Sequence, residues 1–111
     1  SVIGDQGRHE EAERRYRELV ETRHRISGPD HPRTRSSLRG HGLELMALGR
    51  YDEANEQLTL ALDRERRLQG EEHTDTLSYE RSLARLRIAA GRFDEALEIL
   101  ERNGLLRHQA R

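Results

Sequence analysis

The stretch GRYDEANEQL, Gly49–Leu58, decides the fold because its opening recurs twice elsewhere in the chain. The same order of Gly, Arg, an acidic residue and Ala appears as GRHEEA at Gly7–Ala12 and as GRFDEA at Gly91–Ala96. The three openings are 42 residues apart, with no insertion between them. Because self-similarity at a fixed period of roughly 20–50 residues is typical of repeat architectures, the sequence predicts a repeated structural unit.

A second marker follows each of the first two openings after 21 residues. It reads GPDHPRT at Gly28–Thr34 and GEEHTDT at Gly70–Thr76. Each begins with a glycine, which suits the left-handed conformation that ends a helix, and the prolines of the first copy prevent that helix from continuing. Asp30 is expected to cap the helix that follows, and Thr74 or Glu72 is expected to open the equivalent helix.

Between these markers the apolar residues recur with a helical period. In the unit that begins with GRYDEA they fall at Tyr51, Ala54, Leu58, Ala61 and Leu62, with charged residues between them. This spacing predicts one apolar stripe on a long helix, and no alternation typical of a strand is present. The predicted helices are His9–Ile26, Pro32–Leu48, Tyr51–Gln69, Thr74–Ala90 and Phe93–Asn103. We therefore expect an all-α fold, an α-solenoid of antiparallel helix pairs.

Composition agrees with thin helical layers. Apolar residues make up 32% of the 111 residues and charged residues 37%, which leaves too little apolar surface for a thick core. We expect one helical-repeat domain over residues 1–111, with units near 7–48, 49–90 and 91–111. That is about two and a half repeats, and we expect them to be part of a longer array.

The turn sequences resemble those of a known family. LGRYDEA at Leu48–Ala54 and AGRFDEA at Ala90–Ala96 look like the turn between the two helices of a tetratricopeptide repeat. A 42-residue period with GPDHPxT between units resembles the kinesin light chain type, which is also common in actinobacterial proteins, and HTDTLSYERSLA at His73–Ala84 is similar to its bacterial form. The resemblance covers residues 7–103 and implies stacked helix pairs.

The resemblance also implies a function and a surface. It implies a non-catalytic protein–protein interaction module that binds a partner peptide or protein in a concave groove, lined by the first helix of each unit. Where the family often has two Asn residues that hold a peptide backbone, this chain has Arg39-Gly40 and Arg81-Ser82. Arg39 and Arg81 are equivalent positions 42 residues apart, and Arg85 lies one turn after Arg81. We expect these three arginines to form a shallow basic strip that takes an acidic segment or a C-terminal carboxylate. The alternative is that these arginines are solvated and paired with neighbouring Glu. The candidate partner-binding residues are Arg35, Arg39, Leu43, Arg81 and Arg85.

Other classes of function receive little support from the residues. The net charge of −1 and the few aromatic residues argue against binding of nucleic acid or a membrane surface. The chain has no Cys, no phosphate-binding loop and no convincing catalytic set, so we expect no enzyme activity, no metal and no cofactor. His31 and His73 are equivalent turn residues and are expected to bond local backbone, whereas His41 is expected to be packed or half exposed. A cytoplasmic location is expected.

Two further expectations concern the ends of the array and the wider protein. The seven residues SVIGDQG are too few to pair with the first long helix, and Leu97, Ile99, Leu105 and Leu106 are expected to be partly exposed. We therefore expect self-association through open ends as one possibility. The alternative to a general interaction module is a tetratricopeptide regulatory segment of a larger bacterial transcription regulator or signalling NTPase.

Overall fold

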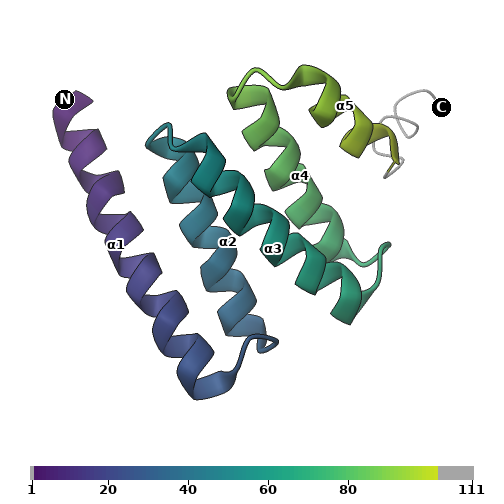
Figure 1. Ribbon diagram of the computed structural model, residues 1–111, viewed down its shortest axis with the longest axis horizontal. Coiled ribbons are helices and arrows are strands. Elements are labelled where there is room, and N and C mark those ends of the chain that lie inside the picture. The colour runs from purple at the N-terminus through teal and green to yellow at the C-terminus, as the bar shows by residue number, and fades with distance from the viewer. Residues whose placement is uncertain (1, 103–111) are drawn as a thin grey trace.

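The protein is an array of antiparallel helices joined by tight turns (Figure 1). The computed structural model describes residues 2–102, with side chains from residue 6 onward, and it contains no strand in that range. The helices are α1 (Val2–Ser27), α2 (Pro32–Ala47), α3 (Tyr51–Gln69), α4 (Thr74–Ala89) and α5 (Phe93–Arg102). The predicted bounds of α2 to α5 are met within one residue, although Asn103 itself lies outside the described residues. The all-α repeat fold is confirmed.

The start of α1 differs from the prediction. The helix begins at Val2 instead of His9, so Gly7 lies inside it and has no positive φ. Glycine permits the left-handed conformation but does not impose it, and extending a helix adds one backbone hydrogen bond per residue. The GRHEEA copy of the repeated opening is therefore not a turn.

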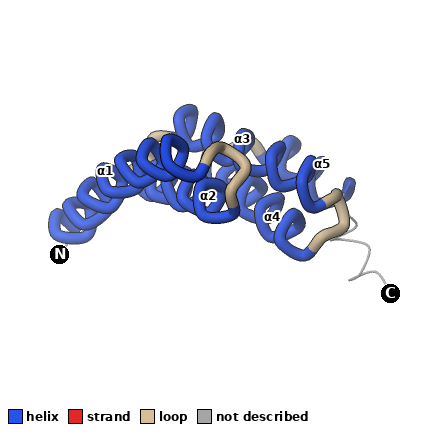
Figure 2. Tube along the Cα trace, turned by 90° about the horizontal axis from the view of Figure 1, so that it is seen from below, coloured by secondary structure: helices blue, strands red, loops and turns tan. Residues whose placement is uncertain are grey.

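The five helices form two layers. α2 contacts α1, α3 and α4, and α4 contacts α3 and α5, so α2 and α4 lie beside each other although they are not consecutive. Figure 2 shows α2 and α4 in one layer, with α1, α3 and α5 in the other. The molecule measures 42 × 36 × 20 Å, and its shortest dimension equals two helix diameters of about 10 Å.

Glycine ends each of the first four helices. The backbone angle φ is positive at all four of these glycines, with values between 77° and 94°. Only glycine adopts this conformation without a steric cost, so each turn reverses the chain within a few residues. These residues are Gly28, Gly49, Gly70 and Gly91.

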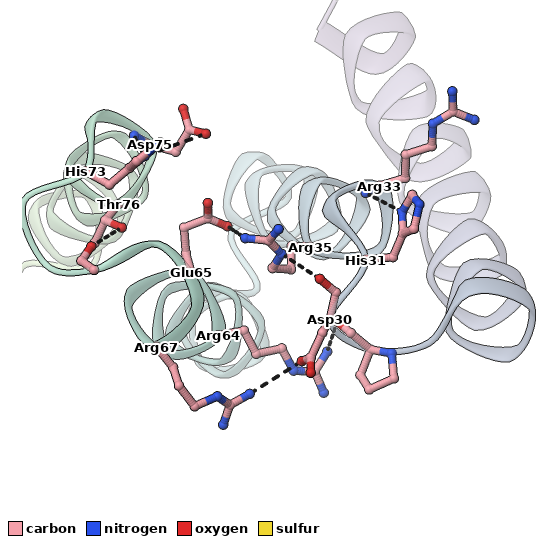
Figure 3. Close-up of polar contacts among 12 residues, drawn as sticks. Asp30, His31, Arg33, Arg35, Arg64, Glu65, Arg67, His73, Asp75 and Thr76 are labelled. Carbon is pink, nitrogen blue, oxygen red and sulfur yellow. Dashed lines mark hydrogen bonds and ion pairs between the residues drawn. The ribbon is translucent and has the colours of Figure 1, made fainter.

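A histidine caps the N-terminus of α2 and of α4. Nδ1 of His31 accepts a hydrogen bond from the backbone N–H of Arg33 at 3.1 Å, and Nδ1 of His73 accepts one from Asp75 at 3.0 Å (Figure 3). The expected local role of both histidines is confirmed. The expectation that Asp30 caps α2 is wrong, whereas Thr74 opens α4 as expected.

Small residues bring the layers close together. A Cβ added at Gly42 of α2 would lie 2.7 Å from Cγ of Leu58 on α3, and one added at Gly40 would overlap the Tyr16 ring of α1. Neither position tolerates a side chain without movement of its neighbour. The shared core consists of Leu38, Leu45, Ala54, Leu58, Ala61, Leu62, Tyr79, Leu83, Ala84, Leu86, Ala96 and Ile99.

Candidate functional site

One surface combines the repeat symmetry with exposed apolar and basic groups. Four positions of α2 recur 42 residues later in α4, and in both helices they are at most half-buried. In α2 and α4 respectively, they are Arg39, Leu43, Met46 and Ala47, and Arg81, Arg85, Ile88 and Ala89. We call these eight residues the α2–α4 face. Because alternate helices of the array are related by the repeat, equivalent positions point to the same side.

Arg39 is held at the polar end of this face. Its Nε donates to Oγ of Ser82 at 3.1 Å, and its Nη2 donates to Oγ of Ser78 at 3.4 Å. The guanidinium carbon lies 5.0 Å from the centroid of the Tyr79 ring, within the range of a cation–π contact. All three partners are uncharged, so Arg39 is fixed in place across α2 and α4 while its positive charge stays uncompensated by them.

The Tyr79 ring lies against the guanidinium of Arg39. Burial raises the pKa of its hydroxyl, the nearby charge of Glu65 raises that pKa further, and the charge of Arg39 lowers it. The ring is therefore neutral over the physiological range, and it offers a stable aromatic surface to the guanidinium.

An apolar hollow occupies the other end of the α2–α4 face. It has a volume of about 380 Å³ and lies between the last turns of α2 and α4. Ile88 is 47% exposed there, and Arg85 lies at the edge of the hollow. The remaining lining residues are Met46, Ala47 and Ala89. An apolar side chain next to a carboxylate is the chemistry that this hollow and its arginine would accept.

The other predicted site residues occupy different environments. Arg81 and Arg85 are exposed, and within residues 6–102 neither forms an ion pair. Leu43 is partly buried on the same side of α2. Arg35 differs from the expectation, because its side chain is only 5% exposed and its Nη1 lies 2.6 Å from Oε2 of Glu65 on α3 (Figure 3). Arg35 therefore joins α2 to α3 and is not part of the α2–α4 face.

Two further side-chain pairs, which the sequence did not predict, link neighbouring helices. Nε2 of His41 on α2 lies 2.7 Å from Oε2 of Glu13 on α1, which places His41 among the packed residues. Nη2 of Arg66 on α3 donates to Oε1 of Glu80 on α4 at 2.9 Å. The α1–α2 interface has a second pair, since Nδ1 of His9 lies 2.6 Å from Oε2 of Glu44. With Arg35 and Glu65, the contacts of His41 and of Arg66 place a polar pair in each of the α1–α2, α2–α3 and α3–α4 interfaces.

The sequence does carry a signal for these pairs. Four of the six residues occupy positions at which another unit has Leu, one or two repeats away. A charged residue at a position that is Leu in another copy needs a partner, because an unpaired buried charge is costly. The four residues and their equivalents are His41 and Leu83, Glu80 and Leu38, Arg35 and Leu77, and Glu13 and Leu97.

The ends of the array expose apolar side chains. On α5, Phe93 is 65% exposed and Leu97 is 46% exposed, whereas Ile99 is buried, contrary to expectation. Leu105 and Leu106 lie outside the described residues. Self-association through open ends stays a prediction.

Other kinds of site find no support in the described part of the chain. Within it, no group of three or more His, Asp or Glu side chains is placed to hold a metal ion. None of the described helices combines the length and the apolar character that crossing a bilayer requires.

Comparison with known families agrees with this geometry. The tetratricopeptide repeat family matches residues 1–63 and 44–102. The search of curated proteins returns no match. The matched segments span all five helices, and the helix pairs, glycine turns and two-layer stacking are the features that the family requires. This chain belongs to the tetratricopeptide repeat family.

Proposed function

We propose that the protein is an interaction module that binds an acidic segment of a partner protein on the α2–α4 face. Tetratricopeptide repeats generally serve as non-catalytic scaffolds for protein–protein contacts. The observation that carries the proposal is the position of Arg85 at the edge of an apolar hollow, with Arg39 fixed on the same face. A segment with carboxylates around one aliphatic side chain satisfies both features at once.

The charges around this face support an acidic partner. Arg39 contacts hydroxyl groups and a ring, and Arg81 and Arg85 have no carboxylate partner within the described residues. A carboxylate from a partner therefore pairs with a guanidinium without first breaking an internal ion pair. Such contacts near the surface are screened by salt, so binding is expected to weaken as ionic strength rises.

An array of immobilised ten-residue peptides tests the proposal. The probes vary the number of Glu residues around a single Leu, and the full chain is applied as a labelled protein. We expect retained peptides to need both the Leu and at least one neighbouring Glu. The double variant Arg85→Glu/Ile88→Asp is expected to lose at least ten-fold in affinity.

The control places an Arg→Glu change on another surface. Arg14 is exposed on α1 and belongs to neither the α2–α4 face nor an ion pair of the described residues. Arg14→Glu is expected to retain the same peptides as the unmodified chain. Equal retention by Arg14→Glu and Arg85→Glu/Ile88→Asp, or no retention of any acidic peptide, contradicts the proposal.

A further inference from the structure

The three arginines of the α2–α4 face gather along about two turns of α4. Arg39 reaches across from α2 to the hydroxyl groups of Ser82 and Ser78, at 3.1 and 3.4 Å. Arg81 follows Ser78 by three residues and Arg85 follows Ser82 by three, and side chains three residues apart are neighbours on a helix surface. We call Arg39, Arg81 and Arg85 the arginine cluster.

The carboxylates of α2 and α4 leave this cluster without a counter-charge. These two helices have three acidic residues, Glu44, Asp75 and Glu80. Glu44 pairs with His9 of α1, and Glu80 is buried against Arg66 of α3, so both side chains are directed towards the other layer. Within the described residues, no carboxylate forms an ion pair with a member of the cluster.

Asp75 limits where on this face an anion can bind. It is exposed in the first turn of α4, one turn before Ser78. Arg85 lies ten residues further along the helix, a rise of about 15 Å. An anion that avoids the Asp75 carboxylate therefore binds towards Arg81 and Arg85, at the end of the face that holds the apolar hollow.

The charge and the donors of the cluster match a phosphate group better than a carboxylate. Arg81 and Arg85 are four residues apart and unpaired within the described chain, so their like charges repel each other. A phosphomonoester has a charge of about −1.5 to −2 at neutral pH and three acceptor oxygens, so it can accept from both guanidinium groups. A carboxylate has a single charge and suits one bidentate guanidinium. The hydroxyl of Ser78, which accepts from Arg39 and donates to no other described residue, is a further donor.

The hollow determines which residue accompanies the phosphate. Arg85 belongs to the cluster and also lines the hollow of about 380 Å³, together with Met46 and Ile88. An aliphatic side chain in the hollow and a phosphate on the cluster must therefore come from residues close together in the partner. Since residues of an extended segment are about 3.4 Å apart, we expect them to be adjacent or separated by one residue.

We infer that the α2–α4 face selects a partner segment in which a phosphorylated Ser or Thr stands next to an aliphatic residue. The inference rests on the proposed function, because it specifies the acidic group that the same face binds. Phosphorylation of the partner then raises its affinity for the face. A protein segment is favoured over a phospholipid, because the hollow accepts one side chain and the net charge of −1 gives no general attraction to an anionic membrane.

Three peptides that differ at one position test the inference. Each has a Leu followed by Ser, phosphoserine or Glu in an otherwise identical sequence, and fluorescence anisotropy measures its binding to the full chain. We expect the phosphoserine peptide to bind at least ten-fold more tightly than the Glu peptide. We expect the Glu peptide to bind more tightly than the Ser peptide, as the proposed function requires.

The variant Arg81→Gln separates selection of phosphate from binding of any acidic group. It removes one guanidinium from the cluster and leaves Arg85 at the hollow. We expect the phosphoserine peptide to lose at least five-fold in affinity and the Glu peptide less than two-fold. Arg14→Gln changes an exposed arginine of α1 in the same way and is expected to alter neither affinity. Circular dichroism checks that both variants keep their helix content.

The outcomes distinguish this inference from the proposed function. Equal affinities of the phosphoserine and Glu peptides overturn the inference and leave the proposed function intact, whereas failure of both peptides to bind contradicts both. An Arg81→Gln chain that keeps the full preference for phosphoserine also overturns the inference. Vesicles that contain a phosphomonoester lipid are the last probe, and we expect no binding to them. Vesicle binding that Arg81→Gln abolishes would show that the cluster serves a membrane surface instead.

Discussion

Glu13 and His41 meet with 2.7 Å between Oε2 and Nε2 in the interface of α1 and α2, where both side chains are almost excluded from solvent. Guanidinium nitrogens of Arg17 and Arg50 lie 3.7 Å from the other oxygen of the same carboxylate. Glu13 is thus the centre of a group of polar side chains from three segments of the chain. A buried carboxylate is costly unless it is paired, so the fold depends on these contacts.

Removing one member of this pair is expected to destabilise the fold. His41→Ala leaves the Glu13 carboxylate buried without its closest partner, and we expect the free energy of unfolding to fall by about 2–4 kcal/mol. Urea denaturation at neutral pH measures this change. A loss below about 0.5 kcal/mol would mean that the pair is exposed or unformed in solution.

The matched double variant is expected to restore stability. Leu83, the equivalent of His41, is buried, and Leu97 occupies the position of Glu13 two repeats later, so Glu13→Leu/His41→Leu replaces the pair with apolar residues that other copies have there. Replacing both members of a buried ion pair by apolar residues is often neutral or stabilising. We expect a free energy of unfolding within about 1 kcal/mol of the unmodified chain, or above it. A double variant less stable than His41→Ala contradicts this account.

Two glycines are expected to respond in opposite directions to Ala. Gly42→Ala brings a Cβ to 2.7 Å from Leu58 Cγ, and we expect a net loss of roughly 1–2 kcal/mol despite the better helix propensity of Ala. Gly7→Ala meets nothing within 4 Å and lies inside α1, so we expect a gain of about 0.5–1 kcal/mol. Thermal denaturation compares both variants. A destabilised Gly7→Ala chain would mean that Gly7 forms a turn.

Tyr79 is expected to make the fold sensitive to alkaline pH. Because burial raises the pKa of its hydroxyl above 10.0, the folded chain holds this proton more tightly than the unfolded chain does. Stability is therefore complete below pH 10 and falls as pH rises through the folded pKa. The chain has no Lys, and Arg stays charged here, so tyrosines dominate the titration in this range.

The variant Tyr79→Phe isolates this effect. It keeps the ring beneath Arg39 and removes the titrating hydroxyl, so we expect the decline in unfolding free energy above pH 10 to become shallower. Urea denaturation at several pH values between 8 and 11 supplies the slopes, with Tyr51→Phe as the control. If Tyr51→Phe flattens the decline and Tyr79→Phe does not, burial of the Tyr79 hydroxyl is not its cause.

Much of the fold was predictable because its turns are local. Gly49 and Gly91 end helices, and the acidic and apolar residues that begin the next helix follow within five residues of each. Gly7 was wrongly placed before the first helix. The residues that precede it are helical, so the same GRxxEA motif lies inside α1. A repeated motif therefore predicts the unit more reliably than it predicts the conformation of one copy.

The candidate site was predictable in part, for a different reason. Arg39 and Arg85 lie on a common face because the repeat relates α2 to α4. Arg35 was misplaced because its partner, Glu65, lies 30 residues away, and helical periodicity says nothing about which charges meet across an interface. The hollow between α2 and α4 arises from the distance between two helices, which no single stretch of sequence specifies.

The most direct test of the central proposal is a ¹⁵N-HSQC titration of the full chain with an acidic, Leu-containing peptide that was retained in the immobilised-peptide experiment. If the α2–α4 face is the binding surface, the largest chemical shift changes will fall in residues 39–47 and 81–89, and Arg85→Glu/Ile88→Asp will abolish them. Changes confined to the exposed surfaces of α3 and α5, or unchanged by that double variant, would contradict the account.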